Sequence, residues 1–246
     1  MKLDANKYTA RLAGIFYLIV VITGIFSLAY VPSKLIVWDD AAKTFGQISE
    51  SQMLFRMSLV SSAICYVAFL ILPFILYRLL HSVNEIAAKL MVILAVVSVP
   101  ISMLNLQNKY AVLTLINGAN YLKNLDASQI QSQTMLLLEN YDKGILILHI
   151  FWGLWLFPFG FLVYKSGFLP KILGILLMLG CCGYLVNFVG NTLFDNFGES
   201  LISNIASKPA ALGEIGTCLW LLIRGINEKA SKNQKPYENG SAARIE

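Results

Sequence analysis

The stretch LAGIFYLIVVITGIFSLAY, residues 12–30, contains no charged side chain. At about 1.5 Å of rise per residue, a helix of this length matches the roughly 30 Å hydrocarbon core of a bilayer. The apolar residues are continuous rather than alternating, which favours a helix over a barrel strand. The stretch is longer than the apolar part of a secretory signal, and no clear cleavage site follows it. We therefore expect an uncleaved membrane span.

Further apolar runs follow along the chain, and they predict spans at about residues 54–80, 86–107, 145–164, 172–194 and 205–226. The chain is 57% hydrophobic and 13% charged, whereas soluble domains are about 45–50% apolar and about 25% charged. The sequence therefore predicts an all-α integral membrane protein, a six-helix transmembrane bundle that forms one domain over residues 1–228. A disordered basic tail is expected over residues 229–246.

The first, third and fifth spans open with similar residues. Arg11, Lys89 and Lys171 each stand directly before an apolar run that begins with Leu or Ile. This similarity leaves open a repeat of three antiparallel hairpins. A basic residue at the start of each inside-to-outside span explains the similarity more simply.

Lys and Arg are distributed unequally between the two sets of loops. Twelve of the 19 fall in the set that includes both termini, and seven fall in the other set. Because positive residues stay on the cytoplasmic side, both termini should be cytoplasmic. This topology also accounts for the net charge of +5, so nucleic acid is not an expected partner. The expected partners are the lipid bilayer and a small-molecule or lipid ligand, and the sequence does not define the oligomeric state.

The loops between the predicted spans differ in length. Residues 31–53 and 119–142, in the outer set, are long enough for each to hold a short helix on the membrane surface or over the bundle, and a solvated linker is the alternative. In the inner set, the turn at residues 165–171 contains Gly167 and Pro170 and is short. The fourth and fifth spans should therefore be antiparallel neighbours.

Polar side chains inside the apolar runs are few. An ionisable group in a span costs at least a few kcal/mol, so it usually faces the bundle interior and has a partner. We expect Glu214 to pair with Arg56 or His149, in a polar cavity in the outer half of the bilayer. Interhelical hydrogen bonding without ligand binding is the alternative, and it is favoured for the Asn and Ser residues. The candidate binding residues are Glu214, Arg56, His149, Asn187, Asn191 and Asn105, the last in a helical stripe with Ser98, Ser102 and Lys109.

No sequence motif identifies a reaction, a cofactor or a metal site. His81 and His149 fall at different depths, which disfavours a haem held between two histidines, and the ligands for zinc are too few. Three functions remain open. The favoured one is the binding or transport of a small molecule, and the others are a membrane-embedded enzyme acting on a lipid-like substrate and a non-catalytic sensor or accessory protein. In the enzyme, Glu214 or His149 would serve as general base.

Several motifs resemble those of a known family. They are RLAGIFYL (residues 11–18), LFR (54–56), FWGLWLFPFG (151–160), KSGFLPKILG (165–174), GEI (213–215) and LWLL (219–222). From about residue 11 to residue 225 the chain resembles the bacterial membrane proteins grouped as domain of unknown function 4386. The resemblance implies a multi-span protein of the bacterial inner membrane and supplies no catalytic residue. It coincides with the physical argument at Arg56 and Glu214.

Overall fold

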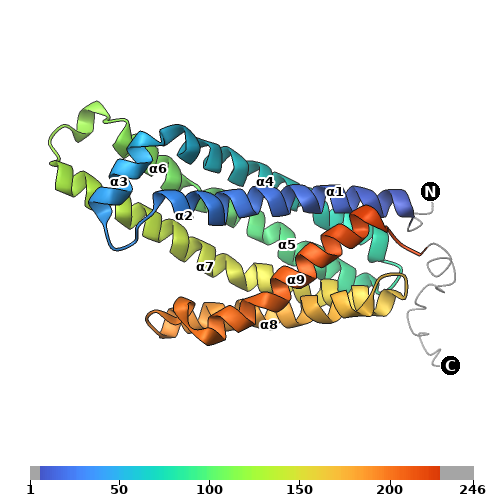
Figure 1. The fold of residues 1–246 in the computed structure, drawn as a ribbon. Helices are drawn as coiled ribbons and strands as arrows, with labels where there is room; N and C mark the ends of the chain where they lie inside the picture. Colours follow the sequence, from blue (N-terminus) through green and yellow to red (C-terminus); the bar gives the residue numbers. More distant parts are fainter. Residues whose placement is uncertain (1–5, 228–246) are drawn as a thin grey trace, which may run out of the picture.

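The computed structural model of the chain describes residues 6–227, and every regular element in that part is a helix (Figure 1). Six long helical segments run up and down along one axis. They are α1 (Lys7–Gly24), continued by the π-helical turn η1 (Ile25–Tyr30) and α2 (Val31–Leu35); α4 (Gln52–Leu80); α5 (Glu85–Asn105), continued by α6 (Gln107–Ile116); α7 (Ala127–Ser166); α8 (Lys171–Leu193); and α9 (Leu201–Ile223). The short elements are α3 (Ala41–Glu50), η2 (Asn120–Leu122) and η3 (Phe197–Glu199).

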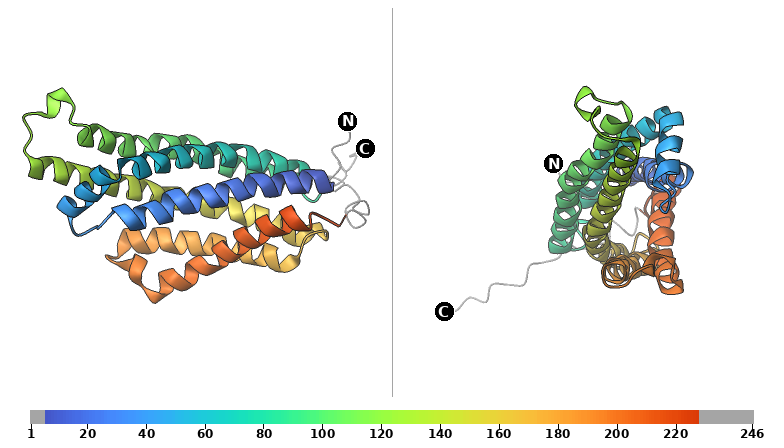
Figure 2. Two further views of the ribbon diagram at one scale, coloured as in Figure 1. Left: turned by 45° about the horizontal axis from the view of Figure 1, so that its top comes forward. Right: turned by 90° about the vertical axis from the view of Figure 1, so that its left-hand side faces the viewer.

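The six long segments form a closed ring. Each packs against the next one in the chain, in the order α1, α4, α5, α7, α8, α9, and α9 packs back against α1. Figures 1 and 2 show that the two ends of the described chain consequently lie at the same end of the bundle. The ring brings residues near the N-terminus into contact with residues near the C-terminus, which no local pattern in the sequence reveals.

Five of the six segments are long and apolar enough to cross a membrane. They are Lys7–Leu35, Gln52–Leu80, Glu85–Ile116, Ala127–Ser166 and Lys171–Leu193. The sixth, α9, is as long as α8, with 23 residues. However, it contains Lys208, Pro209 and Glu214 and is not among the candidate spans. The predicted all-helical fold is therefore confirmed, with five candidate membrane-spanning helices among the described residues, whereas six spans remain a prediction.

The helix ends follow from short-range hydrogen bonding. The side chains of Asn84, Asp126 and Ser200 each accept a bond from the backbone N–H three residues later and begin α5, α7 and α9. Such caps satisfy donors that a helix cannot satisfy internally. Gly167 ends α7 with a φ of 68° in the left-handed region, and α8 starts directly after Pro170. The predicted tight turn is confirmed, since α7 and α8 pack as antiparallel neighbours.

The helices are much longer on the side away from the termini than the sequence indicated. The fourth predicted span, residues 145–164, is only the second half of α7, whose 40 residues extend about 60 Å at 1.5 Å per residue. Residues 127–142 are thus the start of α7 rather than a separate surface helix. The other long loop does hold a short helix, α3, which packs on α7. Figure 2 shows this end of the bundle projecting beyond α8 and α9.

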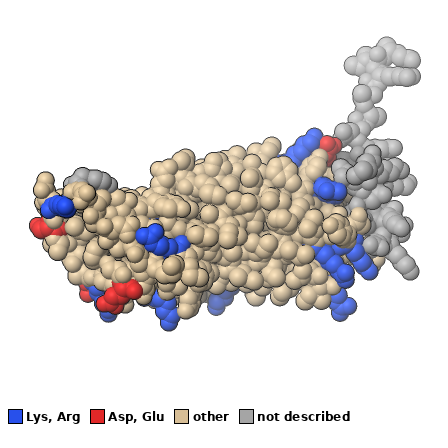
Figure 3. Space-filling view, turned by 90° about the horizontal axis from the view of Figure 1, so that it is seen from above, with Lys and Arg blue, Asp and Glu red and all other residues tan. Residues whose placement is uncertain are grey.

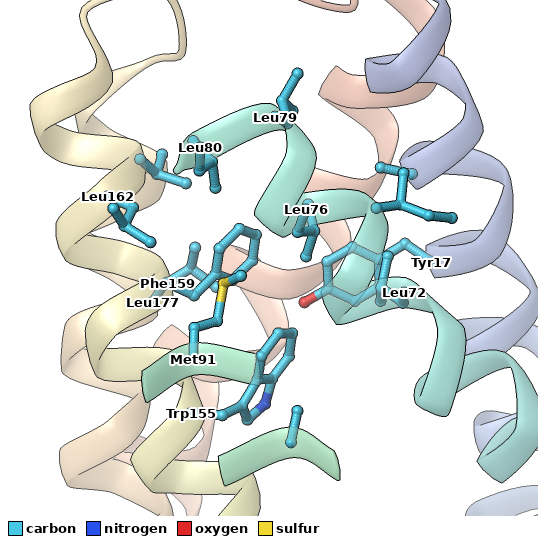
Figure 4. Close-up of a cluster of buried hydrophobic side chains, with 14 of the residues drawn as sticks. Tyr17, Leu72, Leu76, Leu79, Leu80, Met91, Trp155, Phe159, Leu162 and Leu177 are labelled. Carbon is cyan, nitrogen blue, oxygen red and sulfur yellow. The ribbon is translucent and has the colours of Figure 1, made fainter. Parts of the chain in front are cut away.

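Two clusters of buried apolar side chains fill the ring. The larger lies toward the termini, and Figure 4 shows its centre, where Tyr17, Trp155 and Phe159 meet Leu72 and Leu76. The smaller lies in the projecting end and is built from α2, α3, α4, α6 and α7. Its members are Val31, Leu35, Ile48, Phe55, Leu59, Leu106, Val112, Leu113, Met135, Leu138 and Tyr141.

The crossing of α7 and α8 depends on two glycines. A Cβ on Gly160 would lie 2.6 Å from the carbonyl oxygen of Gly174 and 2.9 Å from the amide nitrogen of Met178. Gly160→Ala should therefore force the helices apart and lower the free energy of unfolding by about 1–3 kcal/mol, the usual cost of overpacking. Chemical unfolding in detergent measures this change.

Gly46 in α3 is the matched control, because a Cβ there meets nothing within 4 Å. Gly46→Ala should leave the stability unchanged or raise it by up to about 1 kcal/mol through helix propensity. Equal responses to the two substitutions would contradict the close crossing of α7 and α8.

Candidate functional site

Glu214 is held by tyrosines from two other helices. Its Oε2 accepts a hydrogen bond from the Tyr17 hydroxyl of α1, and its Oε1 accepts one from the Tyr184 hydroxyl of α8, each at 3.3 Å. Both distances exceed the usual value of about 2.7–2.8 Å for bonds between two oxygens, so the carboxyl is loosely held. The three residues lie near the middle of their helices, whereas spacing from the helix ends had suggested the outer half of the membrane.

Neither expected ion pair with Glu214 is present. Within residues 6–227 the carboxyl has no Lys, Arg or His nitrogen within ion-pair distance, and its side-chain partners are the two tyrosines. An ionised carboxylate offers about four acceptor positions, and the tyrosines occupy two of them. Glu214 is also only partly buried. The carboxyl thus retains capacity to accept bonds from a bound group.

Glycines bring α9 close enough for these contacts. A Cβ on Gly14 of α1 would lie 2.6 Å from the amide nitrogen of Leu222 in α9, and one on Gly180 of α8 would lie 2.8 Å from the Cα of Ala210. Gly183 faces the carbonyl oxygen of Ala206 at still closer range. Small residues let helix backbones approach in this way in membrane proteins. The backbone of α9 is therefore in direct contact with α1 and α8 on either side of Glu214.

Aromatic rings surround the two tyrosines. The Tyr17 ring lies 6.4 Å from those of Trp155 and Phe159, which stack on one another at 5.2 Å (Figure 4). The Tyr184 ring meets the His149 imidazole edge-on at 5.2 Å. His149 is thus one ring removed from Glu214, where the sequence had suggested a direct pair.

Two buried polar atoms near this group have no hydrogen-bond partner. They are Nδ1 of His149 and Oγ1 of Thr217, which lies one helical turn beyond Glu214. Buried polar atoms are nearly always paired, and an unpaired one calls for an explanation. Together with the Glu214 carboxyl, these atoms make the region between α1, α7, α8 and α9 the candidate site.

Asn187 connects two helices, Asn191 bonds within its own helix, and neither forms a hydrogen bond to Glu214 within the described part of the chain. Asn187 donates to the hydroxyl of Ser207 at 2.9 Å and accepts from that of Ser203 at 2.6 Å, which ties α8 to α9. Asn191 donates to the carbonyl oxygen of Asn187. Because the Asn187 amide is bonded at both ends, the structure gives it the interhelical role that the sequence favoured.

Arg56 and Asn105 lie in the projecting end of the bundle. Arg56 is exposed and donates to Asn117 at 3.2 Å, beside Gln52, which donates to the same oxygen at 2.6 Å. Asn105 donates to the carbonyl oxygen of Tyr141 in α7. Hydrophobic periodicity places a residue along the chain but does not say which helix faces it, so the sequence had grouped these side chains with Glu214.

Lys109, which shares the predicted helical stripe with Asn105, is buried among the helices. Only 2% of the residue is exposed. Its ammonium donates to the carbonyl oxygen of Ser27 at 3.3 Å and lies 4.3 Å from the centre of the Tyr141 ring. Ser27 belongs to the π-helical turn η1, and such turns often occur at functional sites. Residues four apart lie on the same face of a helix. The spacing of Asn105 and Lys109 is therefore the sequence signal that could have indicated the burial of Lys109.

The fold and the site define a class of protein: a helical membrane protein with a partly buried acid held by tyrosines inside its helix ring. The family described as domain of unknown function 4386 (DUF4386) matches residues 12–225, and the chain belongs to it. An uncharacterised protein from the archaeon Archaeoglobus fulgidus is 35% identical over 77 residues, which are 31% of this chain and 43% of that protein. The chain thus matches less than half the length of that relative. No solved structure matches the chain.

A double-mutant cycle tests the contact between Lys109 and Tyr141. Tyr141→Leu removes the ring beneath the ammonium and should cost more stability in the native chain than in a Lys109→Met background. The coupling should be about 1–2 kcal/mol, as expected for a desolvated cation on an aromatic face. Unfolding of the four proteins in the same detergent measures the coupling, and additive effects would exclude the contact.

Proposed function

We propose that this protein binds a small organic cation at Glu214, inside a membrane bundle of six spans. The observation that carries the proposal is the pair of tyrosine bonds to a carboxyl that has no cationic partner within the described residues. A carboxyl near the middle of a membrane-spanning helix is costly to retain, and such groups in membrane proteins usually mark binding or transport sites. Binding at this site would be the first step of transport or of sensing.

The ligand class follows from the surroundings of the carboxyl. The carboxyl is bonded by Tyr17 and Tyr184, and the rings of Trp155, Phe159 and His149 pack against these two tyrosines. Aromatic faces attract ammonium groups, and the attraction strengthens where water is excluded. Small-molecule sites typically combine apolar walls with a few placed polar groups. A carboxyl among aromatic rings therefore suits an amine or quaternary ammonium that also carries apolar groups.

Two probes of nearly equal shape test this proposal. Benzyltrimethylammonium carries a positive charge, and neopentylbenzene replaces its nitrogen with carbon. Titration calorimetry of the purified protein should show binding of the cation and much weaker binding of the neutral probe. Glu214→Gln should weaken binding of the cation by at least about tenfold, since it removes the negative charge that attracts the ammonium.

The control for this experiment is Glu139→Gln, because Glu139 lies exposed on α7. It should leave the affinity for the cation unchanged. Equal affinity of both probes for the native protein, or equal affinity of native and Glu214→Gln proteins for the cation, would reject the proposal. Loss of stability in Glu214→Gln with no binding by the native protein would instead support a packing role.

We also propose that both termini face the cytoplasm of a prokaryotic cell. Lys7, Arg11, Arg78, Lys89 and Lys171 all lie at the end of the bundle where the chain begins. Figure 3 shows several blue side chains at that end of the bundle, and others on the opposite half. The positive-inside rule assigns such an end to the cytoplasm, and the closed ring of six helices favours α9 as a sixth span.

Reporter fusions test the orientation and the number of spans together. Alkaline phosphatase, active only outside the cytoplasm, should be active when joined after residue 118 or 198. It should be inactive after residue 84 or 228. Activity after residue 228 combined with activity after residue 198 would show that α9 does not cross the membrane, and the fully reversed pattern would overturn the orientation.

A further inference from the structure

A surface pocket of about 450 Å³ lies where the described chain begins and ends. It is formed by the start of α1, the end of α9 and the turn between α7 and α8. The lining residues are Lys7, Phe168, Trp220, Arg224, Gly225, Ile226 and Asn227. Its volume falls within the usual range for small-molecule sites, about 300–1,000 Å³. This pocket is separate from Glu214 and has no part in the function proposed above.

The backbone turn after α9 places Gly225, the neighbour of Arg224, against Lys7. After α9 ends at Ile223, the amides of Arg224 and Gly225 both donate to the carbonyl oxygen of Trp220, at 2.9 and 3.0 Å. Gly225 then adopts a φ of 68°, a left-handed conformation that reverses the chain and suits glycine. A Cβ on Gly225 would lie 3.5 Å from Cγ of Lys7. The turn therefore holds the end of α9 directly against the start of α1.

The charges around this pocket favour an anion. Among the described residues that line the pocket, the ionisable ones are Lys7 and Arg224, and both are basic. The positive end of the α1 dipole also lies here, since α1 begins at Lys7 and is capped by Asn6. Arg in particular presents a fork of N–H donors that matches the oxygens of a phosphate group. A phosphate seated in the pocket would contact two cations contributed by opposite ends of the chain.

The surface beside the pocket indicates the source of that phosphate. Trp220 lines the pocket, and Leu219 and Ile223 of the same helix are exposed. Exposed Leu and Ile suit contact with lipid tails, and Trp is enriched at the level of lipid head groups. Basic pockets between membrane helices commonly bind the head groups of anionic lipids. We propose that this pocket binds the phosphate of an anionic membrane lipid whose tails lie along the end of α9.

Native mass spectrometry of the full chain in detergent tests the proposal. The protein is titrated with palmitoyl-oleoyl-phosphatidylglycerol, with the corresponding phosphatidylcholine and with inorganic phosphate. The native protein should retain phosphatidylglycerol in preference to the other two. The double variant Lys7→Gln/Arg224→Gln should weaken this binding by about 30-fold, roughly fivefold for each basic side chain removed.

The control is Arg11→Gln/Arg78→Gln, which removes the same charge from two exposed residues at the same end of the bundle. This variant should retain phosphatidylglycerol within about twofold of the native affinity, because neither residue lines the pocket. Since all four side chains are exposed, both variants should fold, which size-exclusion profiles and the unfolding midpoint check.

Each other outcome has a definite meaning. Equal losses in the two double variants would show a general charge effect and overturn the pocket as a lipid site. Equal retention of phosphatidylglycerol and phosphatidylcholine by the native protein would overturn the preference for an anionic lipid. Retention of inorganic phosphate, lost only in Lys7→Gln/Arg224→Gln, would keep the phosphate site and reject the lipid as its source.

Discussion

The close contact of α9 with α1 and α8 is the constraint on which the candidate site depends. Gly14, Gly180 and Gly183 have no Cβ to hold the backbones apart, and a methyl group at any of them would overlap backbone atoms of α9. With larger residues at these positions, Glu214 would move away from both tyrosine hydroxyls. The same contact closes the ring of helices by joining the first span to the last helix. Small residues at three positions thus determine both the architecture and the environment of its central acid.

The two ends of the bundle differ in construction because its helices differ in length. The α8 and α9 helices, with 23 residues each, are close to the length that a bilayer requires. The longer α7 and the continuous α5 and α6 extend past them and carry a second apolar core, capped by α3. Lys109 lies buried in that part, where its ammonium packs on the Tyr141 ring and donates to the Ser27 carbonyl oxygen of η1. The buried base Lys109 and the partly buried acid Glu214 therefore lie in separate parts of the bundle.

Much of the fold was predictable, because hydropathy reveals long apolar helices and turns that contain Gly and Pro mark where such helices end. The tight turn at residues 165–171 and the short helix in residues 31–53 are examples. The continuity of α7 was missed because residues 127–142 are too polar to score as a span. In the site, Glu214 and His149 were found as costly groups in apolar runs. The residues that contact Glu214 and His149 were not found. Those contacts depend on which helix faces meet, and the periodicity of a single sequence does not show which faces meet.

The most direct test of this account is the infrared absorption of the Glu214 carboxyl, assigned by its loss in Glu214→Gln. The band should be measured in protein labelled with ¹³C at the glutamate carboxyl groups, in the native chain and in Tyr17→Phe and Tyr184→Phe. If α9 brings the acid between the two tyrosines, each substitution removes one hydrogen bond and shifts the band, and the double variant shifts it further. An unchanged band in both single variants would contradict the arrangement from which the proposed function is derived.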